Sequence, residues 1–251
     1  MTSERMSAIT TIAGRELKSL FVSPIAYLVL FLFFIAMGTL FSLMAFRPNE
    51  LAEIRPVTDF SRFALFFILP GLTMSIFSEE YKTGRIEMLR TSPITEAQLL
   101  LGKFFGAYAF YLVLLAATLV YVLLLTIYGR PDWGQTMAAY LGMLLMGGMF
   151  IAVGIFFSAC TKDQIVAYLA TLLVLGFLTF ASGLSTLLPT NVSLFGLTIP
   201  AAATLNYLGV GSHIGDFSKG VVDTAHVSYF LLVTLFFLLM TYLLLESRKW
   251  R

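Results

Sequence analysis

Long apolar runs alternate with short polar segments along this chain. Six of the runs suffice to cross a bilayer as helices, because about 20 helical residues span its hydrocarbon core. They cover residues 24–46, 60–78, 104–128, 136–159, 164–188 and 228–245, and the middle of each lacks Asp, Glu, Lys and Arg. The pattern predicts an all-α polytopic membrane protein with six transmembrane helices in a single domain, residues 1–251.

The residues before the first run have a different pattern. In residues 1–23, apolar side chains such as Ile12 and Leu17 share one helical stripe, whereas Arg15 and Lys18 lie mostly elsewhere. An amphipathic helix of this kind lies in the membrane interface. The segment is too polar for the apolar region of a cleavable signal peptide, and the first run is long enough to span, so we expect that run to remain as the first span.

The connection between the fifth and sixth runs is too apolar for a free loop. Residues 195–208 carry no charge, yet Gly196 and Pro200 interrupt them. Broken backbone is tolerated at membrane depth only where protein buries it. We therefore expect one or two short re-entrant helices in the outer leaflet.

The most polar segment between two runs is residues 79–103, which hold 8 of the 30 charged residues. Ile86, Met88 and Leu89 interrupt these charges, so a short helix here can present an apolar ridge to another protein. Pro93 should end that helix near Thr91, because proline disfavours helical geometry in the residue before it.

A second helix should begin directly after this turn. Thr95 and Gln98 have the spacing of a capping box, and Ile94 and Leu99 fit the hydrophobic staple that often accompanies one. The segment therefore predicts a helix, a sharp turn at Pro93 and a new helix that continues into the third run.

The order of residues in this segment resembles the permease subunits of type 2 ABC transporters. The positions that carry the resemblance are Glu80, Gly84, Glu87, Leu89, Ser92, Pro93, Ile94, Gly102 and Lys103. Residues 216–230 and the closing 246–250 resemble the gliding-motility-type branch of that family. The resemblance implies an exporter with a separate ABC ATP-binding subunit and a second permease, either a copy of this chain or a relative.

We interpret residues 79–92 as a coupling helix that sits in a groove of the ATP-binding subunit. Ile86, Met88 and Leu89 would anchor it. The other residues assigned to this ATPase-coupling site are Glu80, Glu87 and Arg90 for register, Gly84 for close approach, Arg85 within the helix, and Pro93 to stiffen the link to the third span. A ligand shifts a conformational equilibrium only through its differential affinity for the two states, so the partner must move this helix.

The Lys and Arg residues predict the orientation. If the N-terminus is cytoplasmic, 11 of the 16 basic residues lie on the cytoplasmic side, as the positive-inside rule requires. Both termini and residues 79–103 would then lie on the cytoplasmic side. The membrane that holds the chain would be the inner (cytoplasmic) membrane of the cell. The basic residues are scattered among acids, unlike the clustered footprint of a nucleic-acid-binding protein.

Candidate chemistry is sparse. Lys103 follows a glycine but lacks the GxxxxGK[ST] pattern of a P-loop, so we expect it to snorkel at the lipid boundary and expect ATP to bind another chain. His213 and His226 could form a metal or acid–base site, although ordinary interface histidines are the favoured interpretation. We predict no catalytic, metal or cofactor site in this chain.

Small residues recur in the fourth run, at Gly147, Gly148 and Gly154 among others. Close helix packing in lipid uses such residues, although a loosely packed glycine-rich span has the same composition. We favour close packing.

Two other functions remain open. An ion-coupled secondary transporter would need titratable residues within its spans. A membrane scaffold or assembly protein would bind partners without transport.

Overall fold

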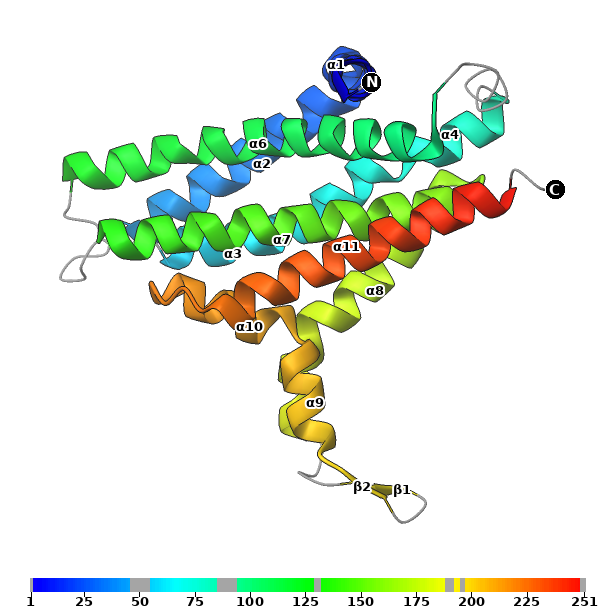
Figure 1. The fold of residues 1–251 in the computed structure, drawn as a ribbon. Coiled ribbons are helices and arrows are strands. Elements are labelled where there is room, and N and C mark those ends of the chain that lie inside the picture. The colour runs from blue at the N-terminus through cyan, green and yellow to red at the C-terminus, as the bar shows by residue number, and fades with distance from the viewer. Residues whose placement is uncertain are drawn as a thin grey trace.

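The computed structural model describes residues 2–45, 55–84, 94–128, 132–187, 192–194 and 197–248. Most of these residues are helical (Figure 1). The helices are α1 (Thr2–Val22), α2 (Pro24–Ala45), α3 (Arg55–Thr73), α4 (Ser75–Thr83), α6 (Glu96–Tyr128), α7 (Trp133–Cys160), α8 (Gln164–Leu184), α9 (Ala201–Leu208), α10 (Val210–Ser218) and α11 (Thr224–Ser247). A 3₁₀ turn, Ser185–Leu187, follows α8, and strands β1 (Val192–Leu194) and β2 (Leu197–Ile199) pair antiparallel.

Five helical stretches of the described chain are long and apolar enough to cross a membrane. They are Thr58–Thr83, Glu96–Ile127, Trp133–Cys160, Gln164–Leu184 and Thr224–Ser247. In α2, the apolar stretch Val29–Leu43 is shorter. The predicted multi-pass helical membrane protein is therefore confirmed, whereas the count of six spans stays a prediction.

Helix α7 lies at the centre of the bundle and is the most buried of these five stretches. It packs against α3, α6, α8, α10 and α11. A methyl group at Gly147 would overlap the Tyr111 ring, and one at Gly154 would overlap the Thr73 side chain. At Gly148 the nearest atom, in Tyr108, would be 3.4 Å away, which is an ordinary contact. Neighbouring helices thus approach α7 most closely at two of the three predicted glycines.

Helix α1 crosses the long helices rather than running along them. Figure 1 shows α1 almost end-on, while α6 and α7 run across the view. It packs on α6, where a methyl group at Gly102 would lie 2.6 Å from Ile12 Cβ. Ile12 is buried by this contact. The transverse arrangement fits a helix in the plane of a membrane interface.

The connection between α8 and α11 differs in part from the expectation. Two short helices are present, α9 and α10, and α10 packs against α7 and α8. Residues 197–199, however, form strand β2 instead of a helix. Pro200 explains the difference, because it disfavours helical geometry at Ile199, and α9 begins directly after it. The hairpin and α9 extend away from the bundle (Figure 1).

Candidate functional site

The structure corrects the extent of the predicted coupling helix. Helix α4 ends at Thr83, and Gly84 follows in the left-handed conformation with φ of 70°. L-residues disfavour this conformation by about 1 kcal/mol or more, so glycine commonly ends helices in this way. Among the described residues, no atom lies within 4 Å of a methyl group placed on Gly84. The predicted close approach of Gly84 to the ATP-binding subunit stays a prediction.

Residues 79–83 therefore form the last turn of α4 and not the start of a separate helix. The remaining predicted coupling residues lie outside the described part of the chain; they are Arg85, Ile86, Glu87, Met88, Leu89, Arg90 and Pro93. On the far side of this segment the predicted capping box is confirmed. Thr95 N donates to Gln98 Oε1 at 2.9 Å, and Gln98 N donates to Thr95 Oγ1 at 3.3 Å.

Lys103 is buried among helices, which makes the predicted snorkelling position wrong. Its side chain is 1% exposed. The ammonium donates to Glu80 Oε1 at 2.7 Å and to the Ile76 carbonyl at 2.8 Å, and it lies 3.6 Å from Glu16 Oε2. The Phe77 ring lies 5.0 Å from the ammonium and adds a cation–π contact.

We call Glu16, Glu80 and Lys103 the lysine cluster. It joins α1, α4 and α6, and its one ammonium serves two carboxylates. Glu80, predicted to face the ATPase, points inward with 12% of its side chain exposed. Its second oxygen, Oε2, is buried without a hydrogen-bond partner in the described structure. Removing one partner from such a buried pair is strongly destabilising, because a charge is then left uncompensated.

The junction between α3 and α4 is stabilised by a side chain from α7. Ser158 Oγ accepts hydrogen bonds from Phe77 N at 3.0 Å and Ser78 N at 3.2 Å, and it donates to the Met74 carbonyl at 2.9 Å. A side chain inserted in this way replaces bonds of the helical ladder. Ser158 thereby ties the interrupted helix to α7.

The last turns of α4 also contact α8 and the end of α11. Gln164 Nε2 at the start of α8 lies 3.5 Å from Glu79 Oε2. Arg248, directly after α11, lies over the Tyr81 ring at 4.6 Å, and its guanidinium donates to the Cys160 carbonyl at 3.0 Å. Helices α6, α7, α8 and α11 thus all meet α4 at the end that leads into residues 85–93.

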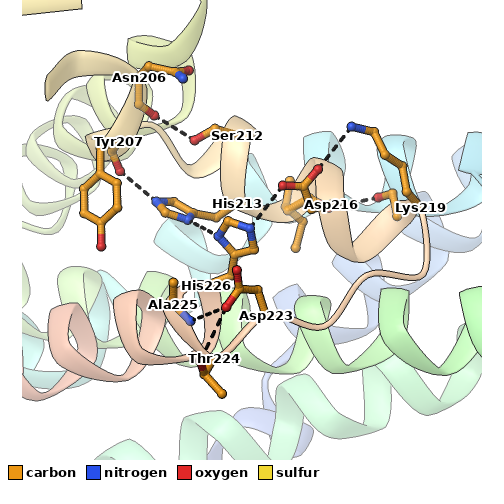
Figure 2. A network of polar contacts seen from close by, with 12 residues as sticks. Asn206, Tyr207, Ser212, His213, Asp216, Lys219, Asp223, Thr224, Ala225 and His226 are labelled. Atoms are coloured by element: carbon orange, nitrogen blue, oxygen red, sulfur yellow. Dashed lines mark hydrogen bonds and ion pairs between the residues drawn. The ribbon is translucent and has the colours of Figure 1, made fainter. Parts of the chain in front are cut away.

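A second polar cluster lies at the other end of α11, and it brings together the two histidines that the sequence analysis singled out. Figure 2 shows a chain of contacts from Tyr207 through two imidazole rings to a carboxylate. His213 Nε2 lies 2.7 Å from the Tyr207 carbonyl, and the Nδ1 atoms of His213 and His226 are 2.6 Å apart. His226 Nε2 lies 3.1 Å from Asp216 Oδ2, and Lys219 donates to Asp216 Oδ1 at 3.1 Å. These five residues are the histidine cluster.

The surroundings of this cluster shift the pKa values of two of its side chains. Burial lowers the pKa of His213, whose residue is 2% exposed, although its contact with the Tyr207 carbonyl acts in the opposite direction. The hydrogen bond from Lys219 lowers the pKa of Asp216. No group of three or more potential metal ligands occurs among the described residues. The two histidines contact each other and, through His226, the Asp216 carboxylate.

The fold is that of a multi-pass helical membrane protein whose spans converge on one polar junction. The family model described as ABC-2 family transporter protein matches residues 57–245, from α3 to the last turn of α11. The chain belongs to this family. It is a permease of an ABC transporter, a membrane component and not itself the ATPase. A comparison with curated proteins gave no match.

Proposed function

We propose that this chain forms the translocation path of an ATP-driven exporter together with a second permease, either a copy of itself or a related chain. A separate ABC ATP-binding subunit supplies the energy. In this proposal the chain belongs to the gliding-motility-type branch, has six spans including α2, and lies in the cytoplasmic membrane with both termini in the cytoplasm.

The observation that carries this proposal is the convergence of helices on the end of α4. Lys103 links α4 to α6 and α1, Ser158 links it to α7, and Arg248 links it to α11. A displacement applied just beyond Gly84 therefore acts on most of the bundle through these side-chain contacts. A peripheral loop without such contacts would move alone.

The docking segment is residues 85–93 in this account, shorter than the coupling helix expected from the sequence. Ile86, Met88 and Leu89 anchor it in the ATP-binding subunit, and Arg85, Glu87 and Arg90 fix its register. Pro93 stiffens the link into α6. Glu80 acts inside the permease, because its carboxylate already bonds Lys103.

The mechanism is a shift between two conformations of the permease. ATP binding changes the spacing of two ATP-binding subunits, and each subunit carries its docking segment with it. Because a partner biases an equilibrium only through differential affinity, the docking segment must fit the two states unequally. Helix α4 passes the movement to the helices that it contacts, and the path between the two permeases opens on the other side.

A co-purification experiment tests this proposal. We expect the double substitution Met88→Asp and Leu89→Asp to reduce retention of the ATP-binding subunit by about thirtyfold or more, since anchor residues of an interface typically contribute 2 kcal/mol or more. Lys82→Asp is the matched control, because Lys82 is exposed on α4 just before Gly84. Equal retention by both variants would refute the docking segment.

One observation favours a second candidate, the ion-coupled carrier. The lysine cluster is a buried set of titratable groups with an unpartnered carboxylate oxygen, as proton or cation pathways use. Transport by such a carrier would stop when the ion gradient is dissipated and would persist without ATP. The exporter predicts the reverse.

A further inference from the structure

The hydrogen atoms of the histidine cluster can be counted from the chemistry of its partners. His213 Nε2 lies 2.7 Å from the Tyr207 carbonyl oxygen. A carbonyl oxygen only accepts hydrogen bonds, so this nitrogen carries a hydrogen. The tautomer of His213 is thereby assigned by its partner.

The far ring nitrogen of His226 meets an equally unambiguous partner. It lies 3.1 Å from Asp216 Oδ2, while the Lys219 ammonium binds the other oxygen, Oδ1. The lowered pKa of Asp216 keeps this carboxyl ionised near neutral pH. An ionised carboxylate has no hydrogen to donate, so His226 Nε2 also carries one.

The third contact joins the two rings directly. Their Nδ1 atoms are 2.6 Å apart, a distance that requires one hydrogen between them. Two hydrogens would clash there, and none would leave two lone pairs facing each other. Three contacts thus need three hydrogens, whereas two neutral imidazoles supply only two.

We propose that His213 and His226 form a proton-binding site that holds one proton more than two neutral rings, and that this proton fastens α9 and α10 to α11. The positive charge resides on His226, which is adjacent to the Asp216 carboxylate. His213 is the neutral partner, because it is 2% exposed and burial disfavours its charged form. The proposal does not depend on the ATP-driven function.

The neighbours of the pair support this charge assignment. On α10 and directly after it the ionisable groups are Asp216 and Lys219, and on α9 the only member is Tyr207. On α11, Tyr229 stacks on His213 with ring centroids 4.1 Å apart, and Asp223 caps the helix by accepting from Ala225 N at 2.9 Å.

Helices α7 and α8 meet α10 through uncharged residues. Gln135 Nε2 of α7 donates to the Ser218 carbonyl at 2.7 Å, and Gly142 faces Phe217. On α8, Ser182 faces Gly209 and Gly211. The contacts from α7 and α8 therefore bring no charge to the two histidines, and the negative charge in direct contact with the pair is that of Asp216.

All three contacts of the site are satisfied in one protonation state only. Loss of the extra proton leaves one of the three contacts without a hydrogen, and gain of a second proton places two N–H groups against each other. Asp216 and Lys219 are the solvent-facing members, with 38% and 60% of their side chains exposed. The proton therefore exchanges with solution on the Asp216 side, and the pH of that compartment controls the attachment of α9 and α10.

Nitrogen NMR of the histidine rings tests this directly, because the chain has only two histidines. The full chain, labelled with ¹⁵N-histidine and carrying a tag free of histidine, is placed in lipid nanodiscs and titrated from about pH 9 to about pH 5, across the ordinary range of histidine. We expect a plateau with three protonated ring nitrogens, in which one ring is charged and the other is the neutral Nε2–H tautomer. Two independent titrations, each passing directly from a neutral to a charged ring, would overturn the proposal.

Asp216→Asn supplies a matched variant. The amide can donate to a bare His226 Nε2, so two neutral rings then satisfy all three contacts and the three-hydrogen plateau should vanish. Lys219→Gln keeps the carboxylate and should keep the plateau. An Asp216→Asn titration identical to that of the parent chain contradicts the site; the parent titration alone decides the matter if that variant does not fold.

A distance measurement tests whether the proton holds α9 against α11. Spin labels are placed at Ala203 on α9 and Leu232 on α11 in a Cys160→Ser background. Their distance distribution should be narrow in the pH range of the three-hydrogen plateau and broader at higher and lower pH. Labels at Met137 on α7 and Leu232 should give an unchanged distribution. Equal pH response of both pairs, or none in the first pair, contradicts the fastening of α9.

Discussion

Lys103 Nζ lies 2.7 Å from Glu80 Oε1, so a cation near the start of α6 is buried against an anion near the end of α4. The two residues flank the docking segment on either side. Because α4 and α6 are antiparallel neighbours, residues at the end of one and the start of the other reach the same level of the bundle. The pair fixes the geometry from which residues 85–93 emerge.

Replacing Lys103 should strongly destabilise the chain. Lys103→Met leaves the Glu80 and Glu16 carboxylates without their ammonium, and breaking a buried ion pair in this way typically lowers the free energy of unfolding by about 3–5 kcal/mol. Lys82→Met, on the exposed end of α4, should change it by less than about 0.5 kcal/mol. Denaturant unfolding in detergent measures both.

A double substitution separates the ion pair from simple packing. Lys103→Met combined with Glu80→Gln should be less destabilising than the sum of the two single changes, because the second change removes a charge that the first leaves unpaired. Strict additivity would contradict the pairing.

Ser158→Ala should weaken the α3–α4 junction. The change leaves Phe77 N and Ser78 N without the oxygen that accepts from them. An unsatisfied buried group costs about 1–3 kcal/mol, so the thermal midpoint should fall. Ser247→Ala on the exposed end of α11 is the control and should leave the midpoint unchanged.

The close contacts of α7 predict a difference between two neighbouring glycines. Gly147→Ala would drive a methyl group into the Tyr111 ring, whereas Gly148→Ala meets Tyr108 at 3.4 Å. Overpacking of a core costs about 1–3 kcal/mol, so only the first change should lower the thermal midpoint appreciably. Equally small effects of both would show that α7 is packed loosely.

The histidine cluster predicts how stability depends on acid. Because the pKa of His213 is lower in the folded chain than in the unfolded chain, the unfolded chain binds more protons below the ordinary histidine value of about 6.5. The contribution of His213 is fully present above that value and is lost as the pH falls below it. Thermal midpoints measured in this window should fall less steeply for His213→Gln than for the parent chain.

The sequence predicts those parts of the structure that depend on residues close together in the chain. The apolar runs predicted the helices of a multi-pass membrane protein, and the Thr95–Gln98 spacing predicted a capping box that the structure contains. Pro200 also carries a local signal, since it disfavours helical geometry at Ile199.

Contacts between distant residues could not be derived in the same way. Lys103 looks like a boundary residue from its position at the edge of an apolar run, and only the stagger of α1, α4 and α6 brings Glu16 and Glu80 to it. His213 and Asp216 share one helical face, which was a readable signal. The approach of His226 depends on how α10 packs beside α11.

Photocrosslinking at the docking segment tests the central claim most directly, namely that an ATP-binding subunit moves this permease by gripping residues 85–93. A photoreactive amino acid is placed at Met88, and another at Val221, which is exposed between α10 and α11 at the opposite end of the bundle. We expect Met88 to crosslink to the ATP-binding subunit in membranes, with a yield that changes on adding ATP, and Val221 not to crosslink to it. Crosslinking at Val221, or its absence at Met88, would contradict the account.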